Sequence, residues 1–285
     1  MFTRSRLTVL AVVASLACAR AAPGPGSNDI LQNIKDSNVI VFEDETTKPV
    51  TKAVHERYPH AVLFGPTCGG TIISPKWILT AAHCTLFTSG RYVLAGTNNS
   101  NDDTGVTRRV KRLVIHPLFT VGPYWLDAKQ YNIKQVAARW DFLLAELEDP
   151  LPINNVTIKA APLSSDFNLP VGLQVGYAGY GTDHHGGVMR DEMHAMDLEI
   201  ESNSVCSDKL EQYNEKDMCC AKGRPPTYDS ACNGDSGSGL VNNKGELLGV
   251  ASWVQDDAHV CEKGKIVVFS RVAAARQWIR SVTNI

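Results

Sequence analysis

The sequence has almost no net charge, because 28 lysines and arginines face 30 aspartates and glutamates, which leaves −2 at pH 7. Proteins that bind mainly nucleic acids or acidic membranes usually show a strong basic excess. We therefore expect neither a nucleic acid nor a membrane as a partner. The short basic run at residues 108–112 (RRVKR) is interpreted as the solvated face of a strand.

Long apolar runs are missing too, apart from one near the start. It covers residues 7–18, follows Arg4 and Arg6, and precedes the small residues Ala19 and Ala21. This order of basic, apolar and small residues is typical of a secretory signal peptide, with cleavage after either alanine. Because the run is too short to span a membrane, the sequence predicts a secreted, extracellular protein.

Helical periodicity is scarce along most of the chain. Short alternating segments, typical of half-buried antiparallel strands, recur at residues 91–95, 113–116, 142–147, 173–177 and 196–200. Turn-rich pieces separate them, so the expected fold class is all-β. Only the end is expected to be helical, since apolar residues recur there at helical spacing, at Val272, Ala275, Ile279 and Val282.

The most informative segment covers residues 232–239 (CNGDSGSG), where Ser236 lies between glycines and follows an aspartate. Glycines allow a substrate to approach closely and allow neighbouring amides to point into one small space. The Ser236 hydroxyl is therefore the expected nucleophile, and the amides of Gly234 and Ser236 are the expected oxyanion hole. A serine nucleophile needs an adjacent base that a third group orients.

Two such partners lie upstream. His83 follows a short apolar run within residues 77–84 (WILTAAHC), and Asp141 begins another within residues 139–147 (RWDFLLAEL). An isolated histidine before a cysteine is usually a packed or surface residue, and an isolated Gly-Asp-Ser-Gly is usually a turn. Together the three segments give the chain order histidine, aspartate, serine, which differs from that of subtilisins and α/β-hydrolases.

These segments resemble the three signatures of the chymotrypsin-like (trypsin-family) serine proteases, and the resemblance covers roughly residues 59–285. Further similar segments lie at residues 68–74 (CGGTIIS), 179–181 (GYG) and 251–253 (ASW). The resemblance implies two six-stranded antiparallel β-barrels with the active site between them and a C-terminal helix. The first barrel would carry His83 and Asp141, and the second would carry Ser236.

The resemblance implies a serine endopeptidase that hydrolyses peptide bonds through an acyl-enzyme. His83 would take the Ser236 proton while Asp141 orients the imidazole. Ser252 would lie beneath this triad, and Trp253 would form a wall of the substrate pocket. The chemistry needs no cofactor, and we expect no metal. The expected partners are protein or peptide substrates, protein inhibitors and an activating protease, and the expected state is a monomer.

Specificity would depend on the pocket for the side chain before the cleaved bond. Counting back from the nucleophile places its base at Ser230, which carries no charge, and the resemblance places its walls at Val254 and Val267. Many relatives have glycine at both walls, so two valines predict elastase-like cleavage after small aliphatic residues. Alternatively, a one-residue insertion would bring Asp229 to the base and favour basic residues.

The chain has eight cysteines, so removal of Cys18 with the signal peptide leaves seven in an oxidising compartment. The resemblance implies three disulfides, which are Cys68 with Cys84, Cys206 with Cys220, and Cys232 with Cys261. Cys219 is left as a free buried thiol or as a partner for another chain, and it could exchange roles with Cys220. Many relatives carry a further cysteine pair, where this chain has Gly176 and Asn242.

The segment expected to be cleaved during activation departs most from the pattern of the relatives. Relatives are zymogens in which cleavage before an Ile-Val-Gly-Gly segment frees an amine that pairs with the aspartate before the nucleophile, here Asp235. The nearest candidate, residues 39–44 (VIVFED), lacks the glycines and a directly preceding basic residue. We divide the chain into a signal peptide at 1–21, a propeptide or N-terminal arm at 22–40, and a protease domain at 41–285.

Two further interpretations stay open. The segment between His116 and Asp141 is longer than in compact relatives, and its aromatic residues would contact either the substrate or one another; they are Tyr124, Trp125, Tyr131 and Trp140. The alternative function is a catalytically weak or silent protease homologue that acts as a binding or regulatory protein. The complete triad favours the enzyme, whereas the narrowed pocket and the irregular activation segment favour the binder.

Overall fold

The computed structural model describes residues 52–86, 91–122, 137–255 and 261–285. The expected signal peptide, propeptide and activation segment lie outside these ranges, as do Tyr124, Trp125 and Tyr131. Within the described ranges, no helix combines the length and the apolar character that crossing a membrane requires.

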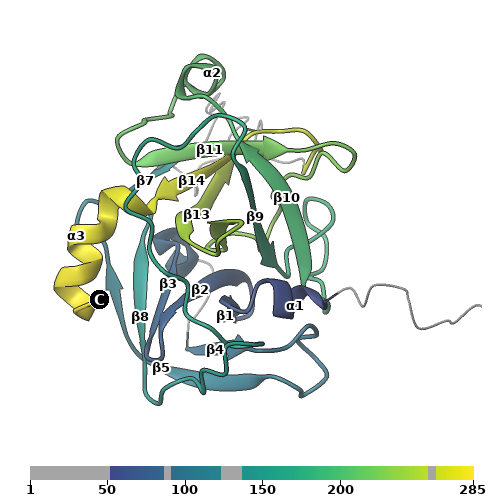
Figure 1. Ribbon diagram of the computed structural model, residues 1–285, viewed down its shortest axis with the longest axis vertical. Helices are drawn as coiled ribbons and strands as arrows, with labels where there is room; N and C mark the ends of the chain where they lie inside the picture. Colours follow the sequence, from purple (N-terminus) through teal and green to yellow (C-terminus); the bar gives the residue numbers. More distant parts are fainter. Residues whose placement is uncertain (1–51, 87–90, 123–136, 256–260) are drawn as a thin grey trace, which may run out of the picture. The chain divides into compact units, whose positions relative to one another are not determined.

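The first barrel is closed by six antiparallel strands (Figure 1). In spatial order they are β1 (Ala61–Phe64), β2 (Cys68–Ser74), β3 (Trp77–Thr80), β8 (Leu143–Leu147), β5 (Val106–Ile115) and β4 (Tyr92–Ala95). The ring closes because β4 also pairs with β1, with Leu94 opposite Leu63. Closure leaves no free strand edge within the barrel.

The second barrel repeats this arrangement with the later strands. In spatial order they are β10 (His194–Ile200), β11 (Met218–Gly223), β14 (Val267–Arg271), β13 (Leu247–Val254), β12 (Gly239–Asn242) and β9 (Gln174–Gly179). Pairing of β9 with β10 closes the ring. The predicted all-β fold of two six-stranded antiparallel barrels is therefore confirmed.

The burial of the strands follows their sequences. β3 and β14 are buried along their length, although β14 ends on the polar Ser270 and Arg271, whereas β10 alternates over its second half, as its period-two pattern predicts. The basic run at 108–112 lies in β5 and is mostly exposed, which confirms its interpretation as a solvated strand face. There Lys111 and Arg112 both form ion pairs with Glu146 on β8.

The predicted C-terminal helix is α3 (Val272–Thr283), whose inward face consists of Val272, Ala275 and Ile279. It lies beside the first barrel (Figure 1), where the Trp278 ring meets the His116 ring edge to face at 4.7 Å. The remaining short elements are α1 (Val54–Arg57), a 3₁₀-helix η2 (Ala82–Leu86), and a two-stranded sheet of β6 (Thr120–Val121) and β7 (Ala138–Arg139).

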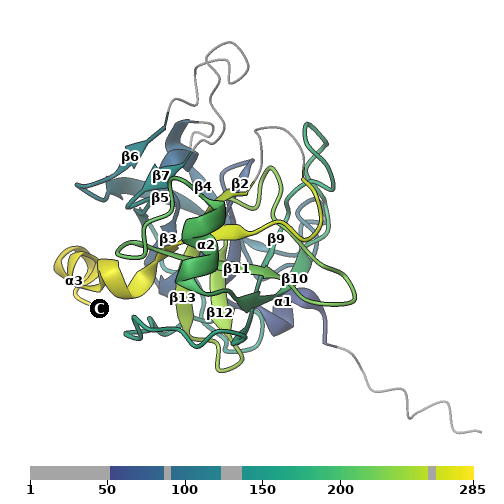
Figure 2. The same cartoon turned by 90° about the horizontal axis from the view of Figure 1, so that it is seen from above.

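The expectation that only the end of the chain is helical was wrong, because α2 (Asn203–Lys209) is also helical. The Ser202 hydroxyl accepts a hydrogen bond from the Val205 amide at 3.2 Å, which is a side-chain N-cap. Figures 1 and 2 show α2 beside β11, to which the Cys206–Cys220 disulfide ties it. A cap and a disulfide therefore support a helix too short to show a clear apolar periodicity.

The structure contains the three disulfides that the resemblance implies: Cys68–Cys84, Cys206–Cys220 and Cys232–Cys261. Among the described cysteines, Cys219 alone is free, and burial raises the pKa of its thiol to about 11. The further cysteine pair of many relatives was expected at Gly176 and Asn242, but these two residues do not face each other. In the β9–β12 ladder, Val175 lies opposite Asn242, and Gly176 lies opposite Val241.

Candidate active site

The histidine and the aspartate of the predicted triad lie in direct contact. His83 is in η2, immediately after β3, and Asp141 lies in the short link between β7 and β8. The His83 Nδ1 atom is 2.6 Å from Asp141 Oδ2, and the His83 backbone amide donates to Asp141 Oδ1 at 2.9 Å. The carboxylate therefore fixes both the position and the ring orientation of the histidine.

The second barrel adds a third donor to this carboxylate. The register of β13 against β14 shifts between Ala251 and Trp253, which leaves Ser252 outside the ladder. Such an irregularity redirects a side chain, and the Ser252 hydroxyl donates to Asp141 Oδ2 at 2.6 Å. Asp141 is therefore held by groups from both barrels.

These contacts keep the Asp141 carboxylate charged although it is fully buried. Burial alone raises the pKa of Asp141, but the charge of His83 and the hydrogen bonds from His83 and Ser252 outweigh it. The net pKa lies below its usual value. Asp141 can thus stabilise a positive charge that develops on the imidazole.

The backbone beside Asp141 is anchored by an ion pair between the buried Asp217 and the partly exposed Arg139. Asp217, just before β11, accepts hydrogen bonds from the Arg139 guanidinium at 2.6 Å and from the Trp140 amide at 3.0 Å. Trp140 has a left-handed φ of 49°, and its ring stacks on the His116 ring at 4.9 Å. The residue before Asp141 is therefore held on both its backbone and its side chain.

Ser236 is placed next to the histidine segment through its main chain. Its carbonyl accepts a hydrogen bond from the Gly69 amide at 2.8 Å, and the Cys84 Sγ atom lies 3.8 Å from the same oxygen. The following residue, Gly237, has φ 85°, and a Cβ there would lie 2.2 Å from Thr80 Oγ1. Only glycine fits this approach of the nucleophile loop to the histidine segment.

The two amides expected to form an oxyanion hole belong to the same turn. Gly234 has φ 94°, and neither its amide nor that of Ser236 donates a hydrogen bond to another described residue. The Asp235 amide between them points elsewhere, since it donates to the Cys232 carbonyl at 3.1 Å. Two backbone N–H groups without an acceptor among the described residues therefore lie at the partly exposed nucleophile turn.

Asp235 itself is buried, and only part of its carboxylate is satisfied. Oδ2 accepts a hydrogen bond from the Cys232 amide at 2.8 Å, whereas Oδ1 has no hydrogen-bond partner among the described residues. The carboxylate lies against Gly181, where a Cβ would be 2.4 Å from it. Burial raises the pKa of Asp235 to about 7, although the Cys232 amide, the charge of Arg190 and the nearby Gly181 amide and Tyr177 hydroxyl oppose this shift.

Two of the residues expected to set specificity are neighbours in the structure. Val254 and Val267 are direct partners at the ends of β13 and β14. Val267 is fully buried, Val254 is partly buried, and the Ser230 hydroxyl is buried without a hydrogen-bond partner among the described residues. The Asp229 carboxylate accepts a hydrogen bond from the Asp197 amide on β10 at 3.1 Å.

Sequence reasoning missed Asp217, although this residue anchors the segment that carries Asp141. An acidic residue directly before an apolar strand is too common to single out, and its partner Arg139 lies far away in the chain. Among the described residues, no three histidine, cysteine or acidic side chains are grouped so that they could hold a metal ion.

Comparison with known proteins agrees with this geometry. A family model described as Trypsin matches residues 47–279. The chain is 62% identical to Scolexin B of Heliothis virescens over 288 residues, which covers 99% of each chain. It is 34% identical to Trypsin zeta of Drosophila erecta, over 77% of this chain and 74% of that protein. It is 31% identical to Chymotrypsin-like elastase family member 1 of Canis lupus familiaris, over 76% and 81% respectively.

Proposed function

The chain belongs to the trypsin family of serine proteases, and we propose that it is a secreted endopeptidase in which Ser236 is the nucleophile. The observation that carries the proposal is the buried His83–Asp141–Ser252 network beside the loop that presents Ser236. Family membership implies protein substrates.

In the proposed reaction, Ser236 Oγ attacks the peptide carbonyl carbon while its proton passes to His83. Asp141 holds the Nδ1–H tautomer and stabilises the imidazolium. The amides of Gly234 and Ser236 then bind the oxyanion, and each such donor is typically worth about 3–4 kcal/mol in the transition state. His83 returns the proton to the leaving amine, which leaves an acyl-enzyme that water hydrolyses.

For specificity, we propose a pocket with Ser230 at its base and with Val254, Val267 and Trp253 along its walls. Two valines facing each other leave room for small aliphatic side chains only. Basic side chains would find no carboxylate there, since that of Asp229 is engaged by the β10 backbone. The preferred substrates are therefore peptides with alanine or valine before the cleaved bond.

For activation, we propose that N-terminal processing creates an amine that pairs with Asp235. The support is the buried Oδ1 atom, which has no hydrogen-bond partner among the described residues. N-terminal sequencing of the mature secreted protein identifies the new terminus, and with it the boundary of the signal peptide and of the propeptide or arm at 22–40.

The direct test is peptide hydrolysis by the mature secreted protein. We expect Ser236→Ala to lower turnover by ~10⁶, whereas Ser204→Ala, a matched change at an exposed residue of α2, should leave it unchanged. A peptide panel that varies the residue before the cleaved bond tests specificity. Turnover that survives Ser236→Ala would overturn the proposed nucleophile.

A second candidate is a catalytically silent homologue that binds other proteins. One observation favours it: Asp235 forms no ion pair within the described part of the chain. If that carboxylate never gains a cationic partner, the Ser236 loop stays unsupported. Absence of turnover in protein whose processed N-terminus has been sequenced would favour this candidate.

A further inference from the structure

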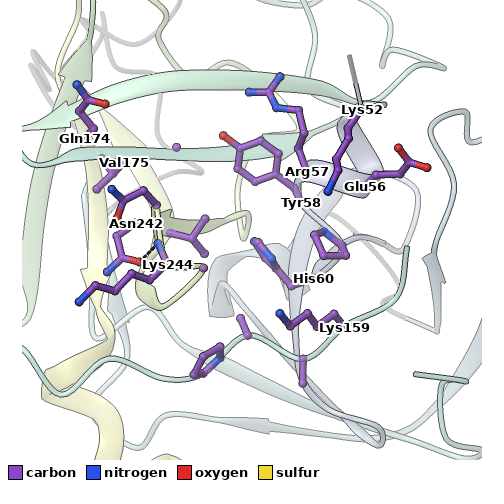
Figure 3. A pocket seen from close by; sticks show the side chains of 18 of the residues that line it. Lys52, Glu56, Arg57, Tyr58, His60, Lys159, Gln174, Val175, Asn242 and Lys244 are labelled. Carbon is purple, nitrogen blue, oxygen red and sulfur yellow. Dashed lines mark hydrogen bonds between the residues drawn. The ribbon is translucent and has the colours of Figure 1, made fainter. Parts of the chain in front are cut away.

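A second polar site lies away from the triad, in a cavity of about 490 Å³. Its walls come from α1, from β9 and β12, and from the segment at 159–162 that follows the first barrel's last strand. None of the three triad residues lines it. We call it the α1 cavity (Figure 3).

The lining of the α1 cavity is strongly basic for a protein of nearly zero net charge. Five cationic residues line it: Lys52, Arg57, Lys159, Arg224 and Lys244. Only two acidic residues, Glu56 and Asp197, do so. The Glu56 carboxylate accepts a hydrogen bond from the Ala53 amide at 3.2 Å, and Figure 3 shows it directed away from the middle of the cavity.

Although Glu56 and Asp197 lie in the same lining, the five cations have no ion-pair partner within residues 52–86, 91–122, 137–255 and 261–285. Elsewhere in the same ranges, basic residues do pair, as Lys111 and Arg112 do with Glu146 and as Lys222 does with Glu201. A cluster of unpaired cations around a concave space attracts an anion.

Two buried nitrogens in the same lining also lack partners. His60 is 5% exposed, and its Nε2 atom has no hydrogen-bond partner among the described residues. Arg224 Nε is also buried and has no hydrogen-bond partner among the described residues. Figure 3 shows the His60 ring and the Lys159 amine directed toward the middle of the cavity. Since an unsatisfied buried donor is costly, these nitrogens indicate a ligand with acceptor oxygens.

His60 suits such a ligand as a neutral group. Burial, reinforced by the charge of Lys159, lowers the pKa of His60 to about 4. A neutral imidazole can donate one hydrogen bond from Nε2, while lysine and arginine supply charge-assisted hydrogen bonds. Because the cavity volume is many times the ~30 Å³ that one water occupies, it exceeds what a single inorganic anion fills.

We propose that the α1 cavity binds a compact organic anion that carries more than one phosphate or sulfate group. The cations would contact the oxyanion groups, and His60 and Arg224 would donate hydrogen bonds from within the cavity. The site is independent of the proposed peptidase activity, because it shares no residue with the triad.

Isothermal titration calorimetry of the full chain tests this, with inositol hexakisphosphate as one probe and a sulfated heparin disaccharide as the other. We expect saturable one-to-one binding of at least one probe. Its affinity should fall steeply between about 50 mM and about 200 mM salt, because binding releases counterions. Tighter binding of the first probe assigns the site to phosphate groups, and tighter binding of the second assigns it to sulfate groups.

The matched variants are Lys52→Glu/Lys159→Glu and Lys76→Glu/Lys216→Glu. Each reverses two charges on exposed lysines without an ion pair in the described ranges, and only the first pair lines the cavity. The first variant should weaken binding by about tenfold or more for each charge-assisted hydrogen bond that it removes, while the second keeps wild-type affinity. A thermal unfolding midpoint close to that of the wild type shows that each variant is folded.

Two results would overturn the proposal. One is the absence of saturable binding of either probe below about 1 mM. The other is an equal loss of affinity in both double variants, which would assign the binding to overall charge and not to the cavity.

Discussion

Asp141 and Asp235 are both buried, at 0% and 1% exposure, yet their surroundings differ sharply. Asp141, which lies just before β8 of the first barrel, accepts hydrogen bonds from a backbone amide, an imidazole and a hydroxyl, and its pKa is lowered. Asp235, in the second barrel's nucleophile loop, has one unpartnered oxygen within the described residues, and its pKa is raised to about 7.

The contrast shows that the hydrogen bonds around Asp141 are complete within the described residues, whereas those around Asp235 are not. The part of the site that holds His83 and Asp141 has its stabilising hydrogen bonds within the described residues. The part of the site that carries Ser236 contains the buried Asp235 carboxylate, which must either bind a proton or gain a cationic partner. The amine that we propose to be released by processing would be such a cationic partner. Asp141 and Asp235 should therefore respond differently to substitution and to pH.

Among changes at the two aspartates and their partners, the largest effect is expected from removing the charge of Asp141. Asp141→Asn leaves the shape of the site intact but no longer enforces the Nδ1–H tautomer, so turnover of peptide substrates should fall by ~10⁴. Steady-state kinetics measures this, with Asp149→Asn at an exposed position as the control. A loss of less than about tenfold would show that Asp141 does not serve catalysis.

Asp235→Asn should change stability in a pH-dependent way. In the unprocessed chain the folded state holds a proton on Asp235 up to about pH 7, whereas the unfolded state loses it near the usual value of 3.8. Wild-type stability should therefore fall as pH rises through this window, by about 4 kcal/mol in total. The variant should lack this fall, and it should be the more stable protein above about pH 7.

Denaturant unfolding of both proteins across this pH range measures the effect. In the processed chain the proposed amine would lower the pKa of Asp235, so the sign should reverse and stability should fall on acidification. Identical pH dependence of wild type and Asp235→Asn before processing would contradict the contrast between the two aspartates.

Asp217→Ala should cost about 2 kcal/mol of unfolding free energy, because the Trp140 amide loses its acceptor while the partly exposed Arg139 can still be solvated. Turnover should fall as well, since the adjacent Asp141 loses its support. Asp217→Asn keeps an oxygen for the Trp140 amide and should recover part of both losses. Asp208→Ala, at an exposed residue of α2, is the control. Unchanged turnover in Asp217→Ala would remove the positioning role.

The smallest effect is expected from Ser252→Ala, which removes one of the donors to Asp141. The pKa of Asp141 should rise, so the stability that its ionised form contributes is lost at a higher pH during acidification. The expected cost near neutral pH is about 1–2 kcal/mol. An acid unfolding profile that matches that of the wild type would show that the Ser252 hydroxyl does not stabilise the carboxylate.

Much of this fold follows from local pattern. The alternation in β10, the apolar run of β3 and the spacing of Val272, Ala275 and Ile279 in α3 each specify a buried face directly. The helix α2 was missed, because its stability depends on the Ser202 cap and on a disulfide to β11, not on periodicity.

The site was predictable only in part. His83, Asp141 and Ser236 lie in short segments that the resemblance identifies. The contact of Asp217 with Arg139, in contrast, joins positions distant in sequence, because the fold brings β7 next to the start of β11. The α1 cavity is of the same kind, since Lys52, Lys159 and Lys244 come from three segments whose proximity only the closed barrels create. Such long-range arrangements leave no periodicity in the sequence.

Labelling with a fluorophosphonate after N-terminal processing, followed by peptide mass spectrometry, tests directly whether Ser236 is an activated nucleophile. We predict a single adduct on Ser236, its loss in His83→Ala, and much slower labelling of the unprocessed chain. A folded, processed protein with no adduct on Ser236, or with the adduct on another serine, would contradict it.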